Sequence, residues 1–421
     1  MRPAGKLRVL GEPAYRRLWI GRTTSLIGDG IAPVALAFAI LDLTGSATDL
    51  GIVLALHSLV LIALVLVGGV VADRISPRRA MLGADLVRTI SMGLIAALLL
   101  GGVAEIWQLA LLYAVDGAAT AFFNPASNAI APQIVPGSRL QEANALLSFS
   151  RWMGKVAGPA LAGILLALGS PGSALAIDAA TFAVSAACLL GVRAPGVRPE
   201  GAGENFVAEL RHGWREFSSR SWQVAIILSL SLSNLIFPGA FLVLGPTVAK
   251  ESLGGSSAWA LIAAAWGVGG LVGGLVALNI RPRYPLLVSE SCVLLFALPI
   301  FLLAIPSATA VIVAGALVSG VTVSIAEILY ETTQAQQIPA EALSRVTAYD
   351  WLGSLALEPI GLALVGPVAA GLGISTTLWL SAVALTLLQA AVLAVPSVRR
   401  LEAVTDESTL VPPPRPIEIG D

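Results

Sequence analysis

The feature that most constrains this chain is a succession of long apolar runs separated by short polar connections. A membrane-spanning helix needs about 20 mostly apolar residues. The runs must form helices, because lipid cannot satisfy an open sheet edge and because they lack the period of two that barrel strands show. The sequence therefore predicts an all-α membrane protein with twelve transmembrane helices in two six-helix bundles. The predicted spans are residues 18–41, 50–71, 81–101, 106–125, 152–168, 174–192, 223–244, 257–279, 286–305, 308–330, 349–370 and 375–396.

The composition fits a chain that faces lipid and excludes several classes of protein. Hydrophobic residues make up 56% of the 421 and charged residues 12%, where a soluble domain has about 25% charged. The net charge of -1 and the absence of a basic tract argue against nucleic-acid binding. Cys188 and Cys292 lie inside apolar runs without metal-type spacing, so neither a metal nor a cofactor is expected.

The placement of Lys and Arg predicts the orientation in the membrane. With the N-terminus in the cytoplasm, nearly all arginines outside the spans fall in cytoplasmic segments, and the opposite loops hold only Lys250. The first apolar run is too long for a signal-peptide core. We therefore expect a multi-pass protein of the cell (inner, cytoplasmic) membrane with both termini in the cytoplasm.

The spans divide the chain into two halves joined by a polar linker. Within the linker, Phe206, Leu210, Trp214 and Phe217 recur at helical spacing, which predicts an amphipathic helix on the cytoplasmic face. The halves echo each other weakly, as parallel repeats of transporters do. The expected organisation is a cytoplasmic segment (1–17), an N-terminal bundle (18–192), the linker (193–221), a C-terminal bundle (222–396) and a disordered cytoplasmic tail (397–421).

A charged motif follows the second span and predicts a gating contact. Glycine allows close approach of a neighbouring helix, an acid can cap or pair at that contact, and arginines hold the turn among anionic headgroups. Simple anchoring of the helix end is the alternative. Two charged residues one turn apart on the third span could extend this network. The motif comprises Gly69, Asp73, Arg74, Arg78 and Arg79, and the extension comprises Asp85 and Arg88.

The fifth span carries small residues at regular spacing. Gly154, Gly158 and Gly163 would permit close helix packing, and Pro159 would permit a bend. Generic packing explains the small residues equally well.

Both motifs resemble those of the major facilitator superfamily. Residues 69–79 resemble its signature between helices 2 and 3, and residues 154–163 resemble its helix 5 antiporter motif. Residues 15–19, 25–29, 124–126, 143–146 and 178–182 are similar to the branch of drug, macrolide and siderophore exporters. The resemblance implies proton-coupled export by alternating access. Ser76 replaces the glycine that the signature carries, and helix 4 has Asp116 where an arginine is common in the superfamily.

Ionisable residues at membrane depth are the candidate transport residues, because a charge in hydrocarbon is costly. Asp29 lies in the middle of the first span, where burial favours the protonated carboxyl and so suits proton carriage. A hydrogen-bonded lock between helices is an equal alternative. Asp116 could pair with Lys155, Arg74 or Arg88, either structurally or for transport.

Two further acids are candidates in the second half. Glu327 lies about one turn deeper than Glu331 and is the better candidate for proton or cation binding, and Glu358 could face the cavity. Asp178 and Glu290 lie near helix ends and are expected to snorkel. His57 is interpreted as a packing residue. Interfacial belt positions account for three tryptophans, Trp107, Trp259 and Trp379.

These observations predict a secondary active transporter that exports a small amphiphilic molecule by proton antiport. No enzyme motif or nucleotide-binding loop occurs, so the chain is not expected to be an enzyme. The expected partners are a small-molecule substrate, protons and membrane lipids, with the protein acting as a monomer. The alternatives are a non-transporting sensor or scaffold on the same fold, an importer, or a lipid flippase.

Overall fold

The computed structural model describes residues 8–74, 76–192, 214–305 and 308–403, and gives only the backbone for residues 66–74, 340–345 and 348. Almost all of these residues are helical. The first half begins with a short 3-10 helix (Arg8–Gly11) and a second one (Gly137–Arg139) precedes α5. Its long helices are α1 (Pro13–Thr44), α2 (Ala47–Arg74), α3 (Pro77–Leu100), α4 (Ile106–Ile134), α5 (Leu140–Leu168) and α6 (Pro171–Leu190).

The second half contains six further spans, three of which are built from several segments. The seventh span joins α8 (Ser221–Pro238), the π-helix η3 (Gly239–Leu244), α9 (Gly245–Val248) and the π-helix η4 (Ala249–Leu253). The eighth is α10 (Ser256–Ala277), the ninth is α11 (Pro285–Val293) with α12 (Leu298–Ala304), and the tenth is α13 (Thr309–Gln337). The eleventh joins α14 (Ala340–Leu355) and α15 (Glu358–Leu372), the twelfth is α16 (Ile374–Ala394), and α17 (Pro396–Arg399) follows.

The predicted set of twelve spans is confirmed. In the described part of the chain, 11 helical segments are long and apolar enough to cross a membrane. The remaining one is α5, whose 29 residues include Arg151 and Lys155 and so lower its apolar character. Several predicted bounds are too short. Helix α4 continues nine residues beyond the predicted end to Ile134, α5 begins at Leu140 instead of residue 152, and the eleventh span begins at Ala340 instead of residue 349. Apolar composition marks the part of a helix in lipid and not the part that extends beyond it.

The linker is described only from Trp214 onward. Residues 214–218 are helical, and Phe217 is buried while Trp214 is half exposed. Both rings lie against Tyr349 of α14, with centroid distances of 6.3 Å and 5.6 Å. Phe206 and Leu210, which the amphipathic prediction also used, lie outside the described residues.

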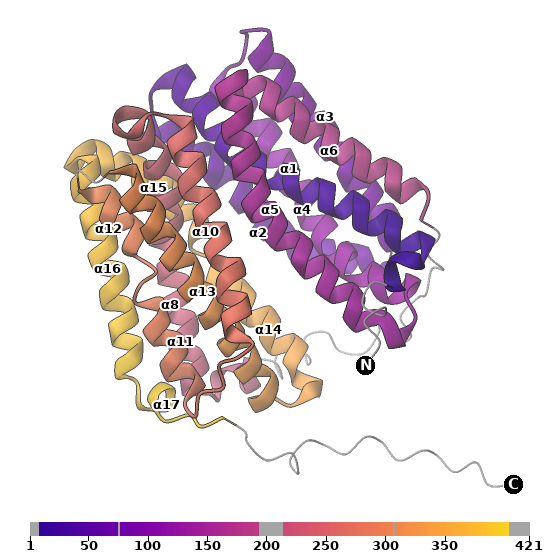
Figure 1. Cartoon of the computed structure of the whole chain (residues 1–421), viewed down its shortest axis with the longest axis vertical. Helices are drawn as coiled ribbons and strands as arrows, with labels where there is room; N and C mark the ends of the chain where they lie inside the picture. Colours follow the sequence, from indigo (N-terminus) through magenta and orange to yellow (C-terminus); the bar gives the residue numbers. More distant parts are fainter. Residues whose placement is uncertain (1–7, 75, 193–213, 306–307, 404–421) are drawn as a thin grey trace, which may run out of the picture.

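The spans form two bundles that touch at one end and separate toward the other (Figure 1). The first and last described helices lie at the open end, which we call the terminal end, and the opposite end is the far end. Helix α2 packs on α15 and α5 packs on α10 across the interface. At the far end, glycines permit direct backbone contact between α2 and α15. A side chain at Gly51 would overlap the carbonyl oxygen of Leu362, and one at Gly366 would overlap the backbone of Thr48.

An ion pair also joins the bundles at the far end, and we call it the far-end clasp. The ammonium of Lys250 in η4 lies 2.6 Å from a carboxylate oxygen of Asp42 and donates to the carbonyl oxygen of Leu41 at 2.6 Å. Leu41 is in the last turn of α1, where helical carbonyls carry partial negative charge. The clasp therefore connects the end of α1 in the N-terminal bundle to the seventh span in the C-terminal bundle.

Candidate functional site

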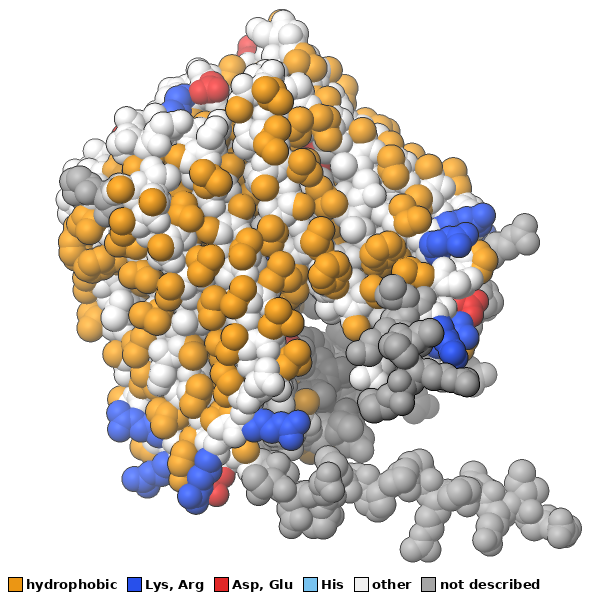
Figure 2. Space-filling model, viewed as in Figure 1, with side chains coloured by type: hydrophobic (Ala, Val, Ile, Leu, Met, Phe, Trp, Pro, Cys, Tyr) orange, Lys and Arg blue, Asp and Glu red, His pale blue; other side chains and the backbone are white. Residues whose placement is uncertain are grey.

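A cavity of about 600 Å³ lies between the bundles, and both of them contribute to its lining. At its far-end side, Leu54, Phe241, Trp259 and Leu362 are buried, whereas Trp351 is 43% exposed. Figure 2 shows the molecule hollowed between the bundles toward the terminal end. The cavity is therefore closed at the far end. Its lining is mainly apolar and aromatic, and its acidic and basic side chains come from Asp29, His57, Lys155 and Glu358.

Asp29 lies in the cavity lining of α1 and is one of the predicted transport residues. Its side chain is 30% exposed and forms an ion pair with the guanidinium of Arg88 in α3. Pro33, four residues later, has no N–H to donate to the Asp29 carbonyl, so the helix is locally weakened where the acid lies. Arg88 itself is 4% exposed and stacks over the ring of Phe182 at 3.8 Å.

Asp116 lies behind Asp29 and is almost fully buried on α4. Arg88 donates to it through Nε at 3.0 Å, and His57 Nε2 lies 3.4 Å from its other oxygen. Of the three partners considered for Asp116, Arg88 is thus the one that the structure shows. Asp116 does not line the cavity. The guanidinium of Arg88 therefore connects Asp29, which lines the cavity, to Asp116, which is buried.

His57 has a more specific place than the packing role predicted from the sequence. It lines the cavity from α2, stacks on Tyr113 with a centroid distance of 4.1 Å, and lies within ion-pair distance of Asp116. Because a lone histidine on an apolar helix has no sequence partner, only the three-dimensional contact reveals this arrangement.

Two other acids of this bundle, Asp178 and Asp85, are buried, and the expectation that Asp178 snorkels to the interface is wrong. Asp178 on α6 is completely buried, and its carboxylate lies against the backbone at Gly28. Neither of its oxygens has a hydrogen-bond partner among the described residues. Asp85 on α3 is likewise fully buried, with Arg88, Arg22 and Ser185 as the polar groups acting on it. Both acids are buried because α6 packs closely against α1 and α3.

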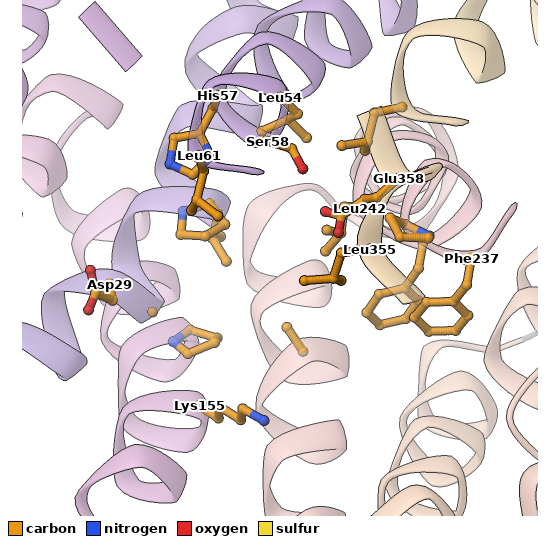
Figure 3. A pocket seen from close by; sticks show the side chains of 18 of the residues that line it. Asp29, Leu54, His57, Ser58, Leu61, Lys155, Phe237, Leu242, Leu355 and Glu358 are labelled. Carbon is orange, nitrogen blue, oxygen red and sulfur yellow. The ribbon is translucent and has the colours of Figure 1, made fainter. Parts of the chain in front are cut away.

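Glu358 is the acid of the C-terminal bundle that lines the cavity, as the sequence predicted. It is the first residue of α15, directly before Pro359, at the break in the eleventh span. Proline disfavours helical backbone in the preceding residue and cannot continue the hydrogen-bond ladder, which explains the break. The hydroxyl of Ser58 in α2 and the ring of His57 are the polar groups that act on the charge of Glu358. Figure 3 shows the Ser58 hydroxyl directed toward Glu358.

Glu327, the other candidate acid of the C-terminal bundle, lies outside the cavity. It is exposed on α13, as is Glu331, and neither residue is part of the cavity lining. Arg151 of α5 and Glu327 are among the charges that act on Glu331.

Glu290, which was expected to snorkel, is instead buried on α11, and that prediction is wrong. Trp259 is also buried and lines the cavity, so its predicted belt position is wrong, whereas Trp107 and Trp379 are exposed.

Of the charged residues in the predicted gating motif and its extension, the structure describes the side chains of Arg78, Arg79, Asp85 and Arg88. Arg78 donates to the carbonyl oxygens of Leu189 and Leu190 at 2.8 Å each, which fastens the start of α3 to the last turn of α6. Arg79 is exposed. For Gly69, Asp73 and Arg74 the structure describes only the backbone. Asp85 and Arg88, the proposed extension, lie inside the bundle with Asp29.

The small residues of α5 produce the close packing expected of them. Gly154 lies against the backbone of Leu26, and Gly158 lies against Gly30, so α5 touches α1 directly. On the other side, a Cβ on Gly163 would be 2.6 Å from that of Ala260 on α10. Pro159 lines the cavity. Helix α5 therefore contacts both bundles.

Comparison with known proteins identifies the family. The family model of the Major Facilitator Superfamily matches residues 18–355. The chain belongs to the Major Facilitator Superfamily. Among curated relatives of this superfamily member, Macrolide efflux protein A of Streptococcus pyogenes is 24% identical over 369 residues, which cover 86% of this chain and 90% of the relative. The Multidrug efflux pump Tap of Mycolicibacterium fortuitum is 26% identical over 407 residues, covering 90% and 95%.

Solved structures share the major facilitator fold. The nucleoside transporter NupG superposes with a TM-score of 0.69 at 15% identity, over 90% of this chain and 98% of NupG. A bacterial homologue of the human lysosomal transporter Spinster, in an inward-facing and unoccupied conformation, gives a TM-score of 0.68 at 16% identity, over 90% and 95%. At these identities the comparison establishes the fold alone. The relatives and neighbours are transporters, in agreement with the predicted class of protein.

Proposed function

We propose that this chain is a secondary active transporter that exports a small amphiphilic molecule by proton antiport with alternating access. The superfamily membership and the efflux relatives support the class of activity. A mainly apolar cavity with a few ionisable groups, enclosed between two bundles, is the expected form of a binding site for such a molecule.

One arrangement carries the proposal of proton coupling. Arg88 is shared between Asp29, which lines the cavity, and Asp116, which is buried. Protonation of Asp29 from the cavity would remove one of the two charges that hold the guanidinium. The contacts between α1, α3 and α4 would then change with the occupancy of a single proton. Two transporter states that differ by a few kcal/mol would shift in population accordingly.

The orientation is part of the proposal. In the view of Figure 2, Lys and Arg side chains gather mainly at the terminal end of the molecule. Lys250 of the far-end clasp lies at the opposite end. Loops rich in Lys and Arg face the cytoplasm. The terminal end would then be cytoplasmic, the bounds of the two bundles would be 18–192 and 222–396, and the cavity would open inward in a monomer of the cell membrane.

Other predicted residues keep assigned roles within this proposal. Glu358 would contribute a second carboxylate to the cavity, and Glu327 would act outside it, on the exposed face of α13. The gating motif at residues 69–79 would control the cytoplasmic end, with Arg78 fastening α3 to α6.

The test is transport by purified protein in proteoliposomes with an imposed pH gradient. We expect the wild type to move dyes from a panel of amphiphilic compounds against their concentration, driven by the gradient. Asp29→Asn should reduce gradient-driven transport by about tenfold or more, because the amide cannot carry a proton. Glu251→Gln, which changes an exposed carboxylate in η4 at the far end, is the matched control and should stay within about twofold. If Asp29→Asn couples normally, Asp29 is not the proton site, and if no compound moves, the proposed activity is wrong.

A further inference from the structure

The charges of the cavity differ in how fully they are neutralised by the protein. The carboxylate of Asp29 is held by Arg88, a guanidinium whose side chain is 5% exposed. The carboxylate of Glu358 lies near two polar groups of the protein, the hydroxyl of Ser58 and the ring of His57, which act on its charge. Each acid of the cavity lining thus has polar protein groups beside it.

The charge of Lys155, in contrast, is not neutralised by a carboxylate among the described residues. Within the described ranges, its ammonium has no carboxylate at ion-pair distance. It lies 4.4 Å from the centroid of the Trp152 ring and 5.7 Å from that of Trp266. Figure 3 shows the side chain extending from α5 toward the opposite side of the cavity. Ring faces attract a cation but accept none of its three N–H groups in ordinary hydrogen bonds, so these donors remain available to a bound molecule.

A second cation lies on the same face of α5. Arg151 precedes Lys155 by four residues, which places the two side chains on one side of the helix, and it is exposed. Its hydrogen bond is to the hydroxyl of Ser148 at 2.9 Å. Helix α5 therefore presents positive charge from the terminal end up to the cavity.

The opposite side of the cavity offers a continuous aromatic surface. Phe237 stacks on Phe241 with a centroid distance of 5.2 Å, and Phe241 lies 4.9 Å from Trp259. All three rings are buried and line the cavity, together with Trp266. Such a surface suits a flat apolar body.

We propose that the cavity binds an amphiphilic organic anion, whose carboxylate pairs with Lys155 and whose apolar body lies against Phe237, Phe241 and Trp259. This inference rests on the proposed transport function and names its class of substrate. An organic cation would meet the opposite situation, because its charge would compete with Arg88 for Asp29 and would approach the ammonium of Lys155. The carboxylate of an organic anion would instead pair with the ammonium of Lys155, for which the described residues supply no carboxylate.

The experiment compares three probes with one body and different head groups, which are pyrenebutyrate, pyrenebutanol and pyrenebutylamine. Binding to the full chain in nanodiscs of uncharged lipid is followed at neutral pH by the saturable energy transfer from tryptophan to pyrene, with empty nanodiscs as background. We expect the butyrate to bind about tenfold more tightly than the amine, since a charge-assisted hydrogen bond replaces a repulsion.

The Lys155 variants assign this preference to one side chain. Lys155→Gln should weaken butyrate binding about tenfold and leave butanol binding within twofold, whereas Lys155→Arg should retain the preference. Arg283→Gln, an exposed cation at the terminal end that pairs with Glu402, should change nothing. Equal binding of butanol by wild type and Lys155→Gln shows that the variant is folded.

Two results would overturn the inference. They are tighter binding of the amine than of the butyrate by the wild type, and unchanged butyrate binding by Lys155→Gln. Neither bears on transport, which the pH-gradient experiment tests on its own with compounds of every charge. A protein that exports cations and rejects pyrenebutyrate would keep the proposed function and lose the proposed substrate class.

Discussion

At the scale of single residues, the most consequential feature is that Arg88 holds two carboxylates inside the N-terminal bundle. The guanidinium is planar and offers several donors in a fixed arrangement, so it can bond Asp29 and Asp116 at once. Buried charges of this kind are tolerated only while they are paired. The stability of the bundle therefore depends on a group that the proposed mechanism also uses.

This dependence gives a prediction for stability. Asp116→Ala should destabilise the protein by about 3–5 kcal/mol, because it leaves a buried charge with one partner fewer. Asp42→Ala removes an acid whose pair with Lys250 is exposed, and should change stability by less than about 1 kcal/mol. Denaturant titration in mixed micelles gives both values, and equal stability of the two variants would contradict the account.

The residues also show where sequence reasoning ended. Asp29, Asp116 and Glu358 were selected because they are acids within apolar runs, which is visible in the sequence. For Asp116 the sequence offers Arg88 as one of three candidate partners. The second bond of Arg88 to Asp29, and the positions of His57 and Ser58, depend on how each helix is rotated. The prediction that Asp178 snorkels is wrong for the same reason, because its burial follows from the packing of α6 against α1.

At the scale of elements, the number of spans was predictable from apolar runs, but their internal breaks were only partly so. The break between α14 and α15 could have been inferred from Pro359. The π-helical segments of the seventh span depend on tertiary contacts, for which a single sequence gives no signal. The end of α4 and the start of α5 lie outside the predicted bounds because polar helical turns resemble loops in composition.

The contact of α2 with α15 gives a prediction at this scale. Gly51→Ala places a methyl group against the carbonyl oxygen of Leu362 and should disfavour the closed far end by about 1–3 kcal/mol. Gly83→Ala on α3 is the control, since nothing lies within 4 Å of its Cβ position. Spin labels on the two bundles should report longer far-end distances in the first variant and unchanged distances in the second. Unchanged distances in Gly51→Ala would show that the two helices tolerate the methyl group.

At the scale of the whole molecule, two bundles are held together at one end by backbone contact and by the far-end clasp. The clasp is exposed, since Lys250 and Asp42 side chains are 36% and 55% accessible. Exposed pairs contribute about 1 kcal/mol or less. It can therefore adjust the balance between open and closed forms without fixing the protein in either.

Lys250→Gln should accordingly shift the populations of the two forms toward an open far end by up to about fivefold. Arg139→Gln is a matched control, because Arg139 pairs with Glu12 within one bundle at a similar exposure. Single-molecule energy transfer between labels on the two bundles measures the ratio directly. High salt should reduce the difference between the wild type and Lys250→Gln, since it screens exposed charges. A shift as large in Arg139→Gln would mean that the effect is not specific to the interface.

The glycine contacts between α2 and α15 have a mechanical consequence. Where helices interlock through large side chains, separating them requires each side chain to leave the space between its neighbours and adopt a new rotamer. These rearrangements create a free-energy barrier to separation. At Gly51 and Gly366 the glycine backbone lies directly against the backbone of Leu362 and Thr48, so little side-chain interlocking opposes the sliding of one helix over the other. We therefore expect the rate of opening at this joint to be governed by the few polar links that cross it and hardly at all by repacking.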